Sequence, residues 1–113
     1  MLETIKKLIE SNGLKVVDVY HGSITEDVVV IRLKGLQPKR QTVSTYEYEI
    51  QLYTKGSIEQ SIKKLQQPLF RQILSSKGVG NPSLSVDQEG LKNYKTKDLK
   101  MMPYIYSIDV IGI

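Results

Sequence analysis

Residues Thr45–Ile62 read TYEYEIQLYTKGSIEQSI, and this stretch decides the fold. Apolar and polar side chains alternate as far as Leu52. Because successive strand side chains point to opposite faces, the alternation predicts a half-buried strand. A glycine then breaks the pattern, and Ser57 with Gln60 is typical of a capping box at the start of a helix. Beyond it, apolar residues recur three or four apart, so a long strand is expected to lead through a short polar turn into an amphipathic helix.

Composition indicates one folded domain spanning residues 1–113. Apolar residues make up 40% and charged residues 25% of the chain, which is typical of a folded protein. Cysteine is absent, which excludes disulfides, thiolate catalysis and cysteine-ligated zinc. The N-terminal segment is too charged for a signal peptide, and no run approaches the ~18 apolar residues of a membrane span. We therefore expect no membrane partner.

The remaining elements are predicted on either side of this stretch. Leu2–Ser11 is expected to form a short helix that ends at Asn12-Gly13. Pro68 leaves two alternatives for the second helix: one kinked helix to Ser75, or two short helices with Pro68 near the start of the second. Strands are expected over residues 14–20, 28–34, 42–54, 83–87 and 104–113. Loops are expected over residues 35–41 and 75–82, and a long mobile connection over 88–100.

The resulting order is α-β-β-β-α-β-β. Short turns between strands favour antiparallel pairing, so we predict an α+β two-layer sandwich with two helices on one face of a mostly antiparallel sheet. At ~3.3 Å per residue the third strand would extend about 40 Å. Part of the hairpin over residues 28–54 is therefore expected to project as an arm that needs a partner. Val28 and Val30 on the polar face indicate cover by a helix or by another subunit. An apolar strand at the C-terminus leads us to expect a whole protein.

Catalytic groups are sparse in the sequence. His21 is the one imidazole, and Asp18 or Asp27 would be its partner if it acted as a general base. We interpret it instead as a turn residue at a strand end. Glu47 and Glu49 share a strand face, and paired carboxylates suit glycosidic chemistry. We interpret this pair as a solvated or inter-subunit face. No enzyme, cofactor or metal site is expected.

A nucleic-acid-binding module is the alternative function. The net charge is +4, with lysine and arginine gathered in two predicted loops, and seven tyrosines could stack on bases. The basic residues of these loops are Lys34, Lys39, Arg40, Lys92, Lys95, Lys97 and Lys100. Four tyrosines, however, share strand faces with isoleucine or leucine, which favours packing in a core or interface. These four are Tyr46, Tyr48, Tyr104 and Tyr106.

The order of elements supplies a resemblance to a known family. A short helix and a strand precede a hairpin whose second strand reads YEYEIQLY (Tyr46–Tyr53), and the helix SIEQSIKKL (Ser57–Leu65) and two strands follow. Over most of its length the chain resembles the small tail-terminator and minor capsid (tail-completion) proteins of long-tailed bacteriophages. Pro68 and the lysine-rich 88–100 connection depart from that pattern.

This resemblance implies a virion structural protein, assembled in the host cytoplasm, that forms a homo-oligomeric ring, usually of six copies. The ring would cap the head-proximal end of the tail and join the tail tube protein to a head-completion or connector protein, with DNA only in passage. The hairpin tip, one sheet face and the lysine-rich connection are then the candidate contacts. The candidate interface residues are Pro38, Lys39, Arg40, Glu47, Glu49, Lys95 and Lys97.

Overall fold

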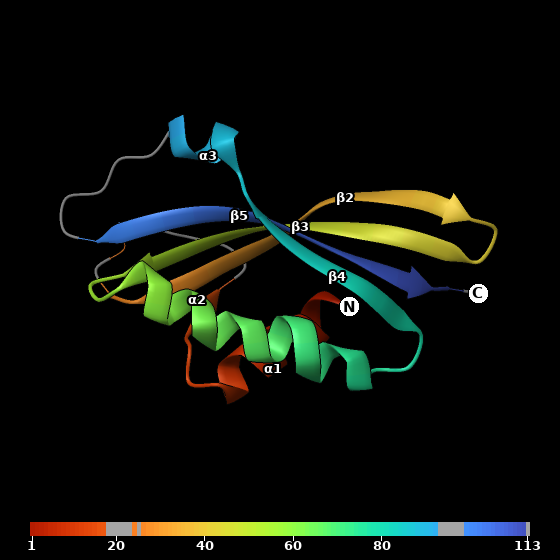
Figure 1. Cartoon of the computed structure of the whole chain (residues 1–113), viewed down its shortest axis with the longest axis horizontal. Helices are drawn as coiled ribbons and strands as arrows, with labels where there is room; N and C mark the ends of the chain where they lie inside the picture. The colour runs from red at the N-terminus through yellow and green to blue at the C-terminus, as the bar shows by residue number, and fades with distance from the viewer. Residues whose placement is uncertain (18–23, 25, 93–98, 113) are drawn as a thin grey trace.

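The structure is a computed structural model that describes residues 1–17, 24, 26–92 and 99–112 (Figure 1). In chain order the elements are α1 (Leu2–Ser11), β1 (Val16–Val17), β2 (Val28–Arg40), β3 (Val43–Thr54), α2 (Ile58–Gln66), the π-helical turn η1 (Gln67–Arg71), the 3-10 turn η2 (Gln72–Ser75), β4 (Val79–Val86), α3 (Gln88–Lys92) and β5 (Lys100–Ile111).

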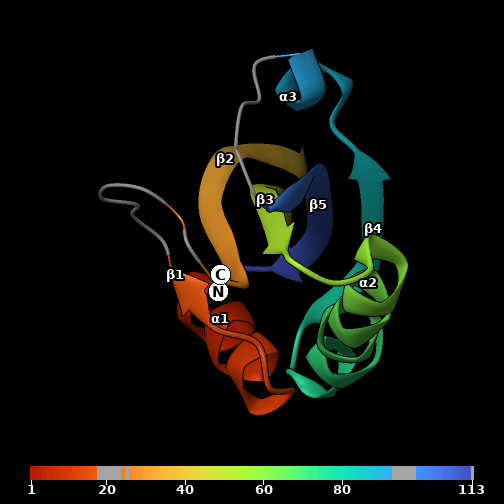
Figure 2. The ribbon, with the colours of Figure 1, turned by 90° about the vertical axis from the view of Figure 1, so that its left-hand side faces the viewer.

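The sheet has the strand order β1-β2-β3-β5-β4, with β1 parallel to β2 and every other pair antiparallel. Figures 1 and 2 show α1 and the α2–η1–η2 segment side by side on one face of the sheet, and the short α3 on the other. The predicted α+β fold, with two main helices on one face of a mostly antiparallel sheet, is confirmed. The helix α3 between the last two strands is an addition to the predicted order.

The core lies between the sheet and the two main helices. Tyr48, Ile50 and Leu52 of β3 face the helices and are almost fully buried, so the alternation along this strand is confirmed. Tyr106 of β5 is opposite Tyr48 and is 0% exposed. Its hydroxyl donates to the carbonyl oxygen of Leu69 at 2.6 Å, which joins the sheet to the helix layer. The chain therefore buries both the rings and the polar atoms of its central tyrosines, as a stable core requires.

The second helix begins and continues as its sequence indicates, but its spacing changes at the proline. The Ser57 hydroxyl oxygen accepts a hydrogen bond from the backbone N–H of Gln60 at 3.3 Å. Pro68 lies at the start of η1, where the N–H of Gln72 donates to the carbonyls of Gln67 and Pro68. Proline has no N–H to donate to the carbonyl oxygen of Lys64, four residues earlier in the helix. A local π-turn follows, and the helical path continues to residue 75. The structure lies between the two alternatives for this helix. The backbone stays helical to Ser75, but it changes from an α-helix to a π-turn at Gln67 and to a 3-10 turn at Gln72.

Replacing Ser57 by alanine is expected to lower the free energy of unfolding by about 1 kcal/mol, because the cap of α2 is lost. Urea unfolding checks this value. Ser61→Ala is the matched control in the same helix and is expected to be neutral or slightly stabilising, since alanine has the higher helix propensity. Equal destabilisation by the two variants would show that the cap contributes nothing.

The loop predicted over residues 35–41 is wrong. Strand β2 continues to Arg40, and only residues 41 and 42 form the turn. The pairing of β2 with β3 shifts register between Leu33 and Gly35 and again between Pro38 and Arg40. Lys34 and Lys39 are therefore extra residues on β2 with no partner in the pairing. Pro38 lies where β2 has no described neighbour except β3, so its missing N–H removes no bond on the outer edge. The edge position of β2 is therefore what allows a proline-containing segment to remain a strand.

Other boundaries also differ from the prediction, and the last strand, expected from residue 104, begins at Lys100. The loop expected over residues 75–82 ends early, because β4 begins at Val79. Pro82 lies within β4, at a register shift between Gly80 and Ser83. The mobile connection expected over 88–100 begins with α3, and residues 93–98 lie outside the described residues. The first predicted strand is described only as Val16–Val17, with residues 18–20 also outside.

A second apolar cluster covers part of the opposite face. Val28, Tyr53 and Leu99 are each no more than 8% exposed and pack together, with Met101 and neighbouring residues around them. The sequence left cover of Val28 by a helix or by another subunit as the two possibilities. The cover that the structure describes here comes instead from Leu99, just before β5, and from Ile24.

Candidate interaction surface at the projecting end of the sheet

The β2–β3 hairpin extends beyond the helix layer, together with the neighbouring end of β5. In Figure 1 the β2–β3 hairpin and the C-terminal end of β5 continue past the last helical turn, and the molecule measures 46 × 27 × 24 Å. We call residues 33–46 of the hairpin and 109–111 of β5 the projecting end. The hairpin thus projects as expected, although with a third strand beside it.

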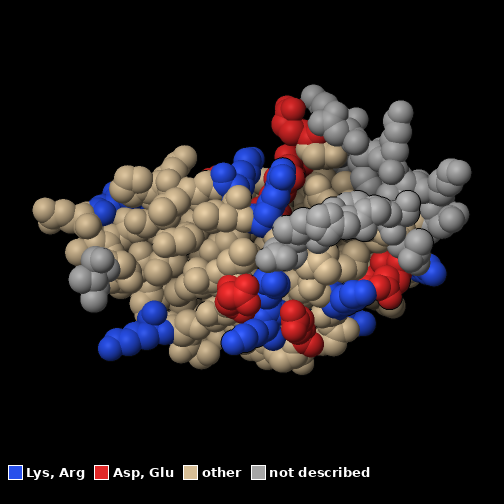
Figure 3. All heavy atoms as spheres, turned by 180° about the vertical axis from the view of Figure 1, so that it is seen from behind, with Lys and Arg blue, Asp and Glu red and all other residues tan. Residues whose placement is uncertain are grey.

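The projecting end exposes leucine on the face that the helices cover elsewhere. Leu33 is opposite the buried Tyr48, and Leu36 is opposite Tyr46, so both leucines share the helix-side face. Their exposed fractions are 49% and 51%, and Ile111 at the same end is 62% exposed. Seen from behind, this end of the molecule shows mostly uncharged atoms (Figure 3). Because full burial of one leucine side chain is worth about 1.5–3 kcal/mol, this surface favours contact with another apolar surface.

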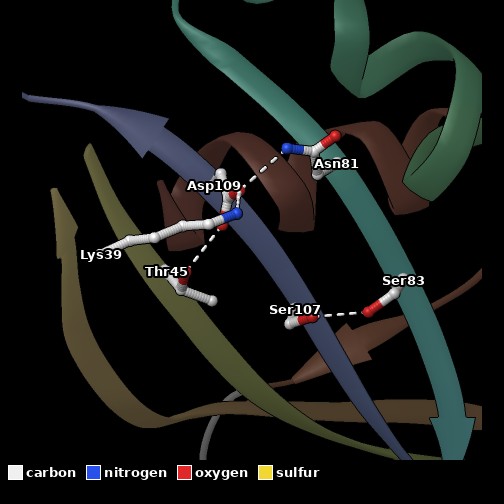
Figure 4. A network of polar contacts seen from close by, with 6 residues as sticks. All are labelled: Lys39, Thr45, Asn81, Ser83, Ser107 and Asp109. Carbon is white, nitrogen blue, oxygen red and sulfur yellow. Dashed lines mark hydrogen bonds and ion pairs between the residues drawn. The ribbon is translucent and has the colours of Figure 1, made fainter.

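A polar cluster around Asp109 lies on the other face of the projecting end (Figure 4). Lys39 Nζ donates to Oδ2 of Asp109 at 2.7 Å, Asn81 Nδ2 donates to the same oxygen at 3.0 Å, and Thr45 Oγ1 donates to Oδ1 at 2.7 Å. Beside them the hydroxyls of Ser83 and Ser107 share a hydrogen bond. We call Lys39, Thr45, Asn81 and Asp109 the Asp109 cluster, and it ties together four strands: β2, β3, β4 and β5.

The electrostatics of the cluster favour an ionised carboxylate. Asp109 is 8% exposed, and burial alone would raise its pKa. The hydrogen bond from Lys39, followed by those from Asn81 and Thr45, outweighs burial and lowers the pKa well below its usual range. Asp109 therefore stays charged at neutral pH and fixes the position of the Lys39 side chain next to the hairpin tip.

The Glu47 and Glu49 carboxylates lie on the same face as the Asp109 cluster but nearer the middle of the sheet. Glu49 accepts from Nε and Nη2 of Arg32 at 3.0 and 2.8 Å. Glu47 lies opposite Gly35 and Ser107. The structure therefore pairs Glu49 within the subunit and does not unite the two carboxylates around a shared partner.

The other predicted interface residues have separate positions. Strand β2 ends with Pro38, Lys39 and Arg40, which therefore do not belong to a loop. The Lys39 side chain donates its hydrogen bond to Asp109. Lys95 and Lys97 lie outside the described residues, as does His21. Asp27, its suggested partner, accepts hydrogen bonds from Thr54 Oγ1 and the Lys55 N–H, which gives it a structural role beside β3.

The open edge of β2 is poorly suited to adding another strand. It carries Lys34, Pro38, Lys39 and Arg40 and two register shifts, all of which discourage edge-to-edge pairing. The exposed leucines instead favour contact through the face of the sheet.

Sequence reasoning did not single out Leu33, Leu36, Asp109 or Asn81. Leu33 continues the alternation of Val29 and Ile31, as a core residue would. Leu36 falls in the predicted loop and reaches the same face through the register shift at Lys34. Asp109 did offer a signal, because it is an isolated charge within an otherwise apolar strand. Its partners come from β2, β3 and β4 and are distant in sequence.

Within residues 1–17, 24, 26–92 and 99–112, no group of three His, Cys, Asp or Glu side chains is arranged to bind a metal ion. None of the described helices is long and apolar enough to span a membrane. No protein-family model matches the chain, and no curated protein matches it either. Inference about function therefore starts from the geometry of the projecting end.

Proposed function

We propose that this chain is a structural subunit that associates with copies of itself through the projecting end, as the tail-terminator ring of a long-tailed bacteriophage. The observation that carries the proposal is the half-exposed pair Leu33 and Leu36 on strands that extend beyond their own helix layer.

The geometry supports an assembly contact in two ways. The leucines present apolar area that a neighbouring copy would remove from water. The Asp109 cluster joins all the strands around the tip, so little conformational freedom is lost when the tip is bound. One end of each copy contacting a different surface on the next is a heterologous contact, and such contacts close into rings when the rotation between copies allows it.

The resemblance in element order supplies the viral part of the proposal. It implies a ring, usually of six copies, between the tail tube protein and a head-completion or connector protein, with DNA passing through. The Pro38–Arg40 tip and the Glu47 side of the sheet would then be available to these components. Glu49 and Lys39 would act mainly within the subunit, since each has an internal partner.

The alternative of a nucleic-acid-binding module loses one of its two supports. Tyr48, Tyr104 and Tyr106 are no more than 7% exposed, so their rings are occupied by packing and are not free to stack on bases. Among the tyrosines that the structure describes, Tyr46 is the one that is only partly buried, and the positive charge of the chain also still favours that alternative.

The double variant Leu33→Ser/Leu36→Ser tests the proposed surface. We expect self-association to weaken at least about tenfold, because a loss of 1.4 kcal/mol at the contact is already a factor of ten. Sedimentation velocity and native mass measurement across a range of concentrations give the change in dissociation constant.

Leu74→Ser is the matched control, since Leu74 is also 49% exposed but belongs to η2 in the helix layer. Its self-association is expected to equal that of the unaltered chain. Equal behaviour of the double variant and this control would exclude the leucine pair as the contact.

A further inference from the structure

A second surface with a distinct chemistry lies on the helix layer. A solvent-open groove of about 590 Å³ runs along α2 and η1 and is lined by Lys63, Gln66, Gln67, Phe70 and Arg71. These positions are spaced three, four, seven and eight residues from the first, so they share one side of the helical path. None of them belongs to the projecting end.

The floor of the groove is rigid. The Phe70 ring packs edge-on against Tyr106, with ring centroids 6.3 Å apart and an interplanar angle of 88°. Tyr106 is in turn fixed by the hydrogen bond from its hydroxyl to Leu69 in the same π-turn. Phe70 is only partly buried, so one part of its ring anchors the turn and the other borders the groove. The groove therefore offers a preformed apolar contact.

The walls of the groove are positive and rich in hydrogen-bonding groups. Lys63 and Arg71 are exposed, and neither forms an ion pair with any acidic residue in the part of the chain that the structure describes. Gln66 and Gln67 each carry an amide that both donates and accepts hydrogen bonds, as a peptide backbone does. Arginine pairs with a carboxylate through two parallel N–H donors, which adds direction to the contact.

We infer that this groove binds an acidic peptide segment of a companion protein, with carboxylates on Lys63 and Arg71 and an apolar side chain on Phe70. A peptide fits better than a nucleic acid, because the groove has two cations and one edge-packed ring. A nucleic-acid strand needs a longer row of phosphate contacts and open ring faces for stacking. The inference rests on the proposed function and deepens it by giving the chemistry of a partner, and its residues lie outside the projecting end.

The test uses a short synthetic peptide in which aspartates flank a central leucine, and the same peptide with asparagine in place of aspartate. Titration of the isotope-labelled full chain is followed by amide chemical shifts. We expect the acidic peptide alone to shift the amides of residues 63–67 and 69–71. The asparagine peptide and a single-stranded oligothymidylate are expected to leave them in place.

Charge-reversal variants separate the groove from the general positive charge of the chain. Lys63→Glu/Arg71→Glu is expected to weaken binding of the acidic peptide by about tenfold or more, as removal of close charge pairs does at interfaces. Lys64→Glu/Lys77→Glu changes the net charge equally at exposed positions outside the groove, and it is expected to weaken binding by less than about twofold, in line with screened surface charges.

The inference is overturned if the two double variants lose affinity equally, if the acidic peptide gives no shift, or if the oligothymidylate shifts the same amides more strongly. Self-association measured on the same samples keeps the two proposals apart. A groove variant that loses the peptide but still assembles would support the groove and leave the projecting end as the self-contact.

Discussion

The Tyr106→Ala variant is expected to lose about 3–5 kcal/mol of unfolding free energy, the range for removing a buried aromatic side chain. Tyr106 is 0% exposed, packs against Phe70 and Tyr48, and donates the hydrogen bond that joins β5 to the π-turn. The cavity would lie between the sheet and the helix layer, where neither can close without moving the other. Because a domain of this size is stable by only about 5–15 kcal/mol, the variant approaches complete unfolding. Urea unfolding followed by circular dichroism measures the loss.

Tyr106→Phe separates the ring from the hydroxyl. It keeps the packing and leaves the Leu69 carbonyl without its donor, so a smaller loss of about 1–3 kcal/mol is expected. Tyr46→Ala is a second comparison, because that ring is only partly buried at the start of the projecting end. A Tyr106→Ala loss no larger than that of Tyr46→Ala would mean that the sheet and helix layer do not depend on this contact.

The Asp109→Asn variant is expected to loosen the hairpin tip and to cost about 2 kcal/mol, after the charge-assisted hydrogen bonds are discounted for the partial exposure of Lys39. The amide oxygen of asparagine can still accept from Lys39 and Asn81 while its NH2 group faces the Thr45 hydroxyl, but the negative charge opposite Lys39 is lost. Faster amide hydrogen exchange over residues 37–46 is expected together with the loss of stability. Urea unfolding and hydrogen exchange measure the two effects.

The pH dependence of the same cluster has a defined sign. The pKa of Asp109 is lower in the folded chain than in the unfolded chain, so the unfolded chain binds more protons in the range between the two values. The stabilisation is complete above about pH 4, the ordinary range of an aspartate, and is lost as the pH falls further. The unaltered chain should therefore lose more stability than Asp109→Asn when the pH is lowered from neutrality to below 4.

Glu49→Gln is the matched control for both experiments. It removes a carboxylate from the same sheet face, but its partner Arg32 is 68% exposed, so the expected loss is at most about 1 kcal/mol. Exchange over residues 37–46 should stay unchanged in this control. If Glu49→Gln matches Asp109→Asn in stability and exchange, the Asp109 cluster has no special role in fixing the tip.

The fold class was accessible from sequence because local patterns and global packing agree over most of the chain. The alternation from Tyr46 to Leu52, the cap at Ser57 and the change to helical spacing all describe the observed β3 and α2. Where the prediction is wrong, residues that normally end strands lie inside them. Two prolines, Pro38 and Pro82, lie where their strand has a described partner on one side only. The strand register also shifts at each proline, so both are tolerated there.

The hairpin turn was misplaced for a related reason. A two-residue hairpin is usually marked by Asn-Gly or Asp-Gly, whose positive φ angles suit the tightest turns. Here Gln41 and Thr42 form the turn without positive φ, so local sequence favours a loop in the glycine- and proline-containing segment before it.

The candidate surface was only partly accessible from sequence. The projecting hairpin was expected from the length of the strand, and Lys39 and Arg40 were expected near its tip. That Lys39 is bound to Asp109 depends on a register between segments 70 residues apart, which no local pattern encodes. Likewise, the exposure of Leu33 depends on where the helix layer ends, and the alternation along β2 is the same on either side of that point.

Sedimentation of the unaltered chain at increasing concentration, followed by electron microscopy of the heaviest species, tests the central claim most directly. We predict a closed oligomer that appears as rings and that Leu33→Ser/Leu36→Ser dissolves into single subunits. A chain that remains a single subunit at every concentration, with or without a tail tube protein, would contradict the account.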